Sequence, residues 1–440
     1  MTKENQYPVS QQGNFAISGI DSLQLAKEYG TPLYVLDESY IRDICKTYKN
    51  TMDLYGENKV LYASKALSCK ALYKIVESEG LGCDVVSEGE LLTALSVNFN
   101  PKNIYFHGNN KTLNEIRLAV ENQVGAIVAD SFTELDLIEE ECIKQNTTQD
   151  ILLRLNTGVE AHTHSFIQTS KVDSKFGFNV VNGDAFTFLE YALSKKHLNV
   201  LGFHSHIGSQ IFEVESFVKA VDVLVNFMKD SKARYNYTTK VLDMGGGFGI
   251  KYTDDDVDLT LEDYANFVKT LCDTVATLTQ QYNLEKPVLM IEPGRSIVGK
   301  AGTTLYTVGS IKEIKEVKNY IAVDGGMFDN PRCALYDSRY TTLIANKPND
   351  KPQKTYTIAG KCCESGDIIT KDCYLPIAER GDILAVLSTG AYNYSMASNY
   401  NRNGIPAMVL ISPNKQTNII VKRQTVEQIM QNDLVPDYLK

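Results

Sequence analysis

The chain has 440 residues, of which 43% are hydrophobic and 22% are charged, values typical of a soluble globular protein. This length exceeds what one ordinary core needs, so we expect a large domain accompanied by a smaller one. The formal net charge of −10, without any run of Lys or Arg, argues against a nucleic-acid-binding surface. No stretch approaches the ~18 apolar residues of a membrane span.

The nine cysteines are scattered along the chain and show no C-x-x-C spacing. The first residues, MTKENQYPVS, lack the apolar core of a signal peptide. We therefore expect a cytoplasmic protein whose cysteines are reduced thiols rather than a disulfide framework.

Eight short apolar segments rich in β-branched residues are predicted to be strands, and segments of helical character separate them. One helical segment begins with Ser131 as a candidate N-cap and has Glu134 three residues later. The predicted strands span residues 60–66, 81–87, 104–108, 126–130, 150–156, 200–208, 240–247 and 288–294. This alternation fits an α/β fold with a (β/α)8 barrel of about 250 residues. An open doubly wound sheet is the alternative, since strand number alone does not show closure.

Polar or small residues stand at the ends of these predicted strands. They are Lys65, Ser87, His107, Asp130, Asn156, His206, Gly245 to Gly247, Glu292 and Arg295. Because barrel enzymes keep their chemistry at the C-terminal ends of the strands, this coincidence predicts one shared pocket.

After residue 304 the pattern changes to strands without helices between them, which predicts an antiparallel β domain. These strands are expected at 305–314, 320–326, 354–360, 382–392, 407–413 and 418–423, followed by a short helix from Thr425. We expect the barrel at 37–304, with 1–36 and 305–440 forming the second domain.

The residues of the predicted pocket indicate a cofactor. Gly245 to Gly247 follow a strand directly, and consecutive glycines let backbone N–H groups approach a phosphate closely. The segment EPGR at 292–295 adds a carboxylate and a guanidinium. The glycine run matches neither the dinucleotide fingerprint nor the P-loop, which weakens an NAD or ATP interpretation. Lys65, a phosphate cradle and an acid at one barrel mouth suggest pyridoxal 5'-phosphate (PLP).

Several motifs carry a resemblance to a known family. In order and spacing they resemble the fold-type III PLP-dependent decarboxylases, which implies a barrel and a mostly antiparallel β domain of the alanine racemase and ornithine decarboxylase type. The motifs are YASKA at 62–66, SKFGF at 174–178, HSHIGSQ at 204–210, DMGGGFG at 243–249, EPGR at 292–295, CCESGD at 362–367, STGAY at 388–392 and MASNYN at 396–401. Within the family the chain most resembles the branch acting on meso-2,6-diaminopimelate, which implies the reaction that forms L-lysine and CO2.

The resemblance also implies roles for individual residues. Lys65 would carry PLP covalently, His206 would stack on its ring, and Glu292 would pair with the pyridine nitrogen. The implied phosphate-binding set is Ser209, Gly245, Gly246, Gly247 and Arg295; Tyr392 would touch the phosphate or the substrate, and Gly294 is a further cofactor-binding residue. The enzyme would be a homodimer with shared active sites, in which Cys363 of one subunit returns a proton to the substrate bound by the other. The implied substrate-binding set is Arg295, Arg332, Tyr336, Glu364 and Tyr392.

Four alternatives stay open. A sister decarboxylase could act on ornithine, arginine or carboxynorspermidine, although Arg332 with Glu364 suits a distal end that has both a carboxylate and an ammonium. A racemase of the alanine type would place an arginine rather than Glu292 at the pyridine nitrogen. A PLP-binding homologue without activity is disfavoured by intact Lys65 and Cys363. A metal-dependent hydrolase could use the His-x-His pairs at 162–164 and 204–206; we expect no metal.

Overall fold

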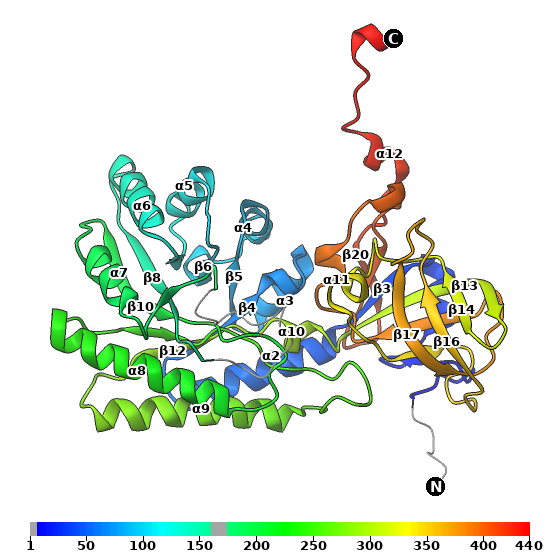
Figure 1. Ribbon diagram of the computed structural model, residues 1–440, viewed down its shortest axis with the longest axis horizontal. Coiled ribbons are helices and arrows are strands. Elements are labelled where there is room, and N and C mark those ends of the chain that lie inside the picture. Colours follow the sequence, from blue (N-terminus) through cyan, green and yellow to red (C-terminus); the bar gives the residue numbers. More distant parts are fainter. Residues whose placement is uncertain (1–6, 160–173) are drawn as a thin grey trace. The chain divides into compact units, whose positions relative to one another are not determined.

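The computed structural model describes residues 7–159 and 174–440 (Figure 1). The chain divides into two compact units. The barrel unit comprises residues 42–250 and 257–297, and the β unit comprises residues 1–41, 251–256 and 298–440.

Eight parallel strands form the barrel, in the spatial order β10, β11, β12, β4, β5, β6, β7, β8. They are β4 (Lys59–Ala63), β5 (Gly82–Val85), β6 (Ile104–Phe106), β7 (Ala126–Ala129), β8 (Gln149–Asn156), β10 (Leu198–His204), β11 (Val241–Asp243) and β12 (Val288–Ile291). Pairing of β8 with β10 closes the sheet on itself, which confirms the predicted barrel and excludes the open sheet. The two-residue strand β9 (Phe178–Asn179) adds to the end of β8.

Helices alternate with these strands, as the sequence pattern predicts. They are α2 (Glu38–Asp53), α3 (Lys70–Ser78), α4 (Glu88–Leu95), α5 (Leu113–Glu121), α6 (Phe132–Lys144), α7 (Asp184–Leu193), α8 (Glu215–Tyr235), α9 (Leu261–Gln281) and α10 (Arg295–Val298). The predicted cap of α6 is confirmed, because the Ser131 side chain accepts a hydrogen bond from the Glu134 amide. Two short 3₁₀ turns, η1 (Ser64–Ala66) and η2 (Pro101–Asn103), accompany β4 and β6.

The Glu134 side chain does not complete the capping box but forms a buried ion pair with Lys111. Their charged atoms lie 3.2 Å apart, and the two side chains are only 1% and 4% exposed. The Lys111 ammonium also donates to the carbonyl oxygens of Gly108 and Val128 at 2.7 and 2.6 Å, so all three of its N–H groups have acceptors. This pair ties the loop after β6 to the N-terminus of α6.

The β unit is built on a mostly antiparallel sheet, as predicted. Its spatial order is β17, β16, β14, β13, β3, β19, β20, with β18 pairing both β13 and β15. The strands are β3 (Leu33–Asp37), β13 (Gly302–Ile314), β14 (Lys318–Val323), β15 (Thr342–Ile344), β16 (Lys354–Ala359), β17 (Ile368–Leu375), β18 (Ile383–Leu387), β19 (Ala407–Ile411) and β20 (Thr417–Val421). Among the described strands of this unit, only the pairs β3–β19 and β14–β16 are parallel.

Smaller elements complete the β unit. They are β1 (Ala16–Ile17), β2 (Ile20–Asp21), α1 (Ser22–Tyr29), α11 (Arg332–Tyr336), η4 (Tyr394–Met396), η5 (Tyr400–Arg402), α12 (Val426–Met430) and η6 (Asp437–Leu439). The predicted terminal helix corresponds to α12, which Thr425 caps. Within the described parts of the chain, no helix is long and apolar enough to cross a bilayer.

Replacing Lys111 by Met should lower the free energy of unfolding by about 3–5 kcal/mol, because Glu134 would remain as an unpaired buried charge. Urea denaturation followed by circular dichroism measures this change. The matched control is Lys49→Met, which removes a surface ion pair with Asp53 and should cost at most about 1 kcal/mol. Equal losses in the two variants would contradict the importance of the buried pair.

Candidate active site

Four neighbouring strands of the barrel carry the predicted cofactor residues at their C-terminal ends. In spatial order they are β10, β11, β12 and β4. His206 follows β10, the glycine run follows β11, Glu292 follows β12, and Lys65 follows β4. Because parallel strands present the same ends at one rim, the barrel brings these residues together.

Lys65 lies two residues beyond the end of β4, not within a strand as the sequence pattern suggests. The strand predicted over 60–66 ends at Ala63, and Lys65 lies at the centre of the 3₁₀ turn η1. Its neighbours in this turn, Ser64 and Ala66, are buried, whereas Lys65 is exposed. The Ser64 amide donates to Asp84 Oδ1 at 3.2 Å, which anchors the turn to the end of β5. The turn therefore directs the Lys65 side chain away from the buried residues on either side of it.

The glycine run packs so closely against its surroundings that side chains have no room. A Cβ atom on Gly246 would lie 2.1 Å from the carbonyl oxygen of Glu292, and Gly247 has a φ of +114°. The Gly245 carbonyl accepts a hydrogen bond from the Glu292 amide at 2.8 Å. The ends of β11 and β12 are thus locked together through backbone atoms.

His206 and Arg295 lie beside this run. The Gly246 amide donates to His206 Nδ1 at 3.2 Å, so this nitrogen is an acceptor and the ring carries its proton on Nε2. Burial, followed by the positive charge of Lys65, lowers the pKa of His206 well below its usual range. The buried Arg295 donates to Ser209 Oγ through Nε at 3.2 Å and Nη2 at 2.9 Å. A neutral ring, a guanidinium and a hydroxyl therefore accompany the glycine run.

Glu292 is buried and contacts two histidines. His107 Nε2 lies 2.7 Å from Oε1, and His204 Nε2 forms a hydrogen bond with Oε2 at 3.2 Å. Burial alone would raise the pKa of Glu292, but the two histidines outweigh it and lower this pKa well below its usual range. The carboxylate is therefore anionic at neutral pH. The sequence pattern placed His107 only at a strand end and assigned no contact with Glu292 to either histidine.

The predicted substrate residues Arg332, Tyr336 and Tyr392 gather within the β unit. The Arg332 guanidinium lies 5.3 Å from the ring centroids of both tyrosines, a cation–π arrangement. Arg332 is 7% exposed, and its buried Nε has no hydrogen-bond partner among the described residues. Tyr392 has a φ of +66°, unusual for a residue with a side chain. This partly satisfied guanidinium suits an anionic ligand.

Cys363 and Glu364 are exposed in the turn between β16 and β17. The Asp367 carboxylate holds this turn, because it accepts hydrogen bonds from the amides of Cys362 and Met327 at 2.6 Å each. The Cys363 amide donates to Asn401 Oδ1 at 2.8 Å. The turn therefore presents both side chains outward from a fixed backbone.

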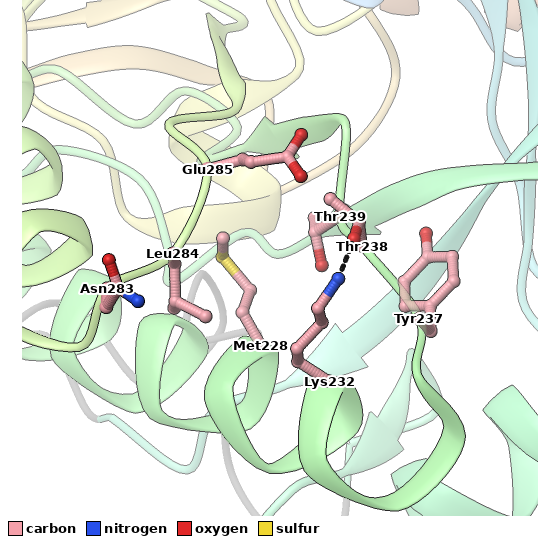
Figure 2. A pocket seen from close by; sticks show the side chains of 8 residues that line it. All are labelled: Met228, Lys232, Tyr237, Thr238, Thr239, Asn283, Leu284 and Glu285. Atoms are coloured by element: carbon pink, nitrogen blue, oxygen red, sulfur yellow. Dashed lines mark hydrogen bonds between the residues drawn. The ribbon is translucent and has the colours of Figure 1, made fainter.

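A small pocket lies at the other end of the barrel strands. Its walls come from α8 and from the segments that precede β11 and β12: Met228, Lys232, Tyr237, Thr238, Thr239, Asn283, Leu284 and Glu285. Figure 2 shows Lys232, whose ammonium donates to Thr238 Oγ1 at 2.6 Å. Its volume of about 60 Å³ is well below the roughly 300 Å³ of a small-molecule site. The glycine-lined rim is therefore the better candidate for the cofactor site.

The structure thus brings Lys65, His206, Ser209, Glu292, Arg295 and the glycines to one rim. The pair His162 and His164 lies outside the described residues. The cluster of His107 with His204 and Glu292 was missed because these side chains come from strands that are distant in sequence. A lysine, a glycine-lined cradle with Arg295, and a buried carboxylate fit PLP, which has a carbonyl, a phosphate and a basic ring nitrogen.

Comparison with known proteins decides the family. The model described as pyridoxal-dependent decarboxylase, pyridoxal binding domain, matches residues 40–299. The chain belongs to the pyridoxal-dependent decarboxylase family.

Relatives in this family match almost the whole chain. The diaminopimelate decarboxylase of Bacillus methanolicus is 49% identical over 417 residues, covering 94% of this chain and 96% of the relative. That of Bacillus subtilis (strain 168) is 47% identical over 426 residues, covering 97% and 96%. The crystal structure of diaminopimelate decarboxylase from M. jannaschii in complex with L-lysine has a TM-score of 0.90, with 34% identity and 99% coverage of both chains. PLP is accordingly the cofactor of this pyridoxal-dependent decarboxylase.

The buried His204 predicts a pH dependence of stability for this decarboxylase. Burial lowers its pKa from 6.5 to about 4, so the unfolded chain takes up this proton at higher pH than the folded chain. Stability is therefore lost as pH falls from about 6.5 towards 4, and the loss from this group should reach about 2 kcal/mol at pH 5.

Urea denaturation of the apoprotein at pH 7 and pH 5 tests this expectation. The His204→Gln variant should lose about 2 kcal/mol less between the two values than the unaltered protein. The half-exposed His197, which pairs with Glu139, provides the control variant His197→Gln, expected to keep most of the original dependence. An unchanged pH dependence in His204→Gln would contradict the assignment.

Proposed function

We propose that this chain catalyses the PLP-dependent decarboxylation of meso-2,6-diaminopimelate to L-lysine and CO2, the last step of lysine biosynthesis. The observation that carries this function is the rim of the barrel, where Lys65, the glycine cradle and an anionic Glu292 meet. The nearly full-length similarity to diaminopimelate decarboxylases supports the choice of substrate.

Several residues would hold the cofactor. Lys65 would carry it covalently, and the backbone amides of Gly245 to Gly247, with Ser209 and Arg295, would bind its phosphate; Gly294 would be a further cofactor-binding residue. Tyr392 would contribute to the same phosphate or to the substrate. The neutral ring of His206 suits stacking on the pyridine ring, since it introduces no second positive charge. When bound, PLP withdraws the electron pair that remains on the α-carbon after CO2 leaves.

The chain's own residues then manage protons and position the substrate. Glu292 would hold a proton on the pyridine nitrogen, because its carboxylate is anionic and buried. Lys65 would hold the cofactor between turnovers, and its amine would be replaced by that of the substrate. Cys363 would give a proton to the α-carbon. Its exposed position in the turn suits a residue that acts on a neighbouring subunit.

The distal end of the substrate sets the specificity. It carries a carboxylate and an ammonium, so its pocket needs a base and an acid. Arg332, whose buried Nε has no partner among the described residues, would bind the carboxylate. The family resemblance adds Arg295, Tyr336 and Tyr392 to the substrate-binding set. Glu364 would bind the ammonium. A decarboxylase for ornithine would have no use for this arginine.

We further infer a cytoplasmic homodimer in which each active site takes Cys363 and Glu364 from the partner subunit. All nine cysteines are free, and the turn that bears Cys363 and Glu364 is exposed in a single chain. A buried Asp367 supports this turn. The family resemblance also implies an ion pair between Asp367 of one subunit and Lys175 of the other, and this pair is a prediction.

Incubation of the PLP-loaded protein with meso-diaminopimelate should release CO2 and lysine in equal amounts, whereas ornithine should not react. The variant Arg332→Leu should lower kcat/KM for diaminopimelate by about 100-fold or more, because a buried carboxylate would lose a charge-assisted hydrogen bond. The exposed Arg339 provides the control Arg339→Leu, expected to leave kcat/KM unchanged. Turnover of ornithine instead of diaminopimelate would overturn the substrate assignment.

Mixing two inactive variants tests the shared site. Homodimers of Lys65→Ala and of Cys363→Ala should each be nearly inactive, the first also lacking the absorbance band of the lysine-bound cofactor. After subunit exchange, a heterodimer would contain one site with both residues intact, so up to about a quarter of the original activity should return, since half of the dimers are mixed and each has one intact site of two. No recovery, despite exchange confirmed by mass spectrometry, would mean that one subunit supplies the whole site.

A further inference from the structure

Two buried histidines contact the Glu292 carboxylate, one at each oxygen. His107 approaches Oε1 at 2.7 Å, although its N–H is not aligned for a standard hydrogen bond, and His204 bonds Oε2 at 3.2 Å. The two imidazoles pack edge to face with centroids 4.8 Å apart. His107 follows β6 and His204 ends β10, so two strands that are not neighbours in the barrel converge on one acid.

We infer that His107 and His204 are positioning residues that hold Glu292 as a carboxylate aimed at the pyridine nitrogen, so that the shared proton stays on the cofactor ring. This inference rests on the proposed pairing of Glu292 with that nitrogen. Each carboxylate oxygen has two acceptor positions, so one contact from each histidine leaves positions for the ring N–H.

The direction of the effect follows from the chemistry of the donors. Burial keeps both imidazoles neutral, because it lowers the pKa of His107 and brings that of His204 to about 4. A carboxylate can only accept, so His204 Nε2 carries the hydrogen and donates it to Oε2. This hydrogen bond and the close contact of His107 with Oε1 stabilise the anion over the acid, which reduces the tendency of Glu292 to take the proton from the ring. Without them, a buried Glu292 would take this proton and leave the ring neutral.

Two other buried acids, Asp243 and Asp84, show what burial does to a carboxyl group that has no histidine contacts of this kind. Asp243 lies at the end of β11 and is fully buried, and its pKa is raised well above the usual range by burial and by the charge of Glu292. Burial and Glu292 raise the pKa of Asp84 in the same way. Arg154 is the nearby cation whose charge acts on both histidines. Among these acids, Glu292 alone has two imidazole contacts, and its pKa alone is lowered.

The same three side chains could be read as a metal site, since their ligand atoms lie within 4.8 Å of one another. Tetrahedral Zn²⁺ with ligands at about 2.0–2.1 Å separates them by roughly 3.3 Å. The 2.7 Å between His107 Nε2 and Glu292 Oε1 is instead the distance of a charge-assisted contact. The geometry therefore favours a carboxylate held by two donors.

The experiment uses the PLP-loaded protein with ¹⁵N in the pyridine ring and reads the ring nitrogen by NMR. The unaltered protein should give a pyridinium signal. His107→Leu and His204→Leu should each move the signal towards neutral pyridine and lower kcat by about 10- to 100-fold, with KM nearly unchanged. His204→Gln, whose amide nitrogen reaches about as far as Nε2, should restore most of the signal.

Three controls make the outcome decisive. His197→Leu, a change at a half-exposed histidine, should leave the signal and kcat unchanged. Should a Leu variant fail to fold, the comparison of Asn with Gln at the same position replaces it, because the shorter amide of Asn cannot reach Glu292. Glu292→Gln tests the pairing of Glu292 with the ring nitrogen separately from the role of the histidines. It should give neutral pyridine if Glu292 faces the ring nitrogen.

A pyridinium signal that persists in the His107 and His204 variants but disappears in Glu292→Gln would overturn the inference and leave the proposed function standing. A signal unaffected by Glu292→Gln would overturn the role of Glu292 itself. Stoichiometric zinc in the purified protein, lost in His204→Leu, would replace the inference with a metal site.

Discussion

Closure of the parallel sheet is the constraint on which the rest of the molecule depends. Because β12 pairs with β4 and β8 pairs with β10, the last barrel strand lies beside the first and the sheet is closed, so residues from opposite ends of the barrel sequence share one rim. His107 and Glu292 are in contact only because of this closure. An open sheet of the same strands would leave the lysine and the glycine run available but would separate the acid from one of its donors.

Burial has opposite consequences for the charged groups of the barrel, and neighbours decide which consequence prevails. Lys111 and Glu134 remain buried as a pair because each hydrogen of the ammonium has an acceptor. The two histidines lower the pKa of Glu292, whereas burial and the charge of Glu292 raise the pKa of Asp243. The carboxyl groups of Glu292 and Asp243 are chemically similar, but their surroundings shift their pKa values in opposite directions. A reaction that depends on proton transfer needs such a difference.

Much of the fold could be predicted from the sequence, because the barrel strands are short, apolar and regularly spaced. The strands of the β unit were harder to predict from the sequence. The strand β17, with the sequence IITKDCYL, has no clear alternation, and β3 joins a sheet whose other strands lie far along the chain. Lys65 and the glycine run were found because lysine and glycine are conspicuous in apolar surroundings. The histidine contacts to Glu292 could not be found, since no local pattern shows which strands face each other across a barrel.

Backbone contacts between the glycine run and Glu292 fix the distance between these two parts of the rim. Gly246 packs against the carbonyl of Glu292, and the Glu292 amide bonds to Gly245, so the cradle and the acid cannot move apart independently. A ligand must therefore match a separation that the main chain has already set. A shorter or longer molecule with the same end groups would then contact either the glycine run or the acid, but not both.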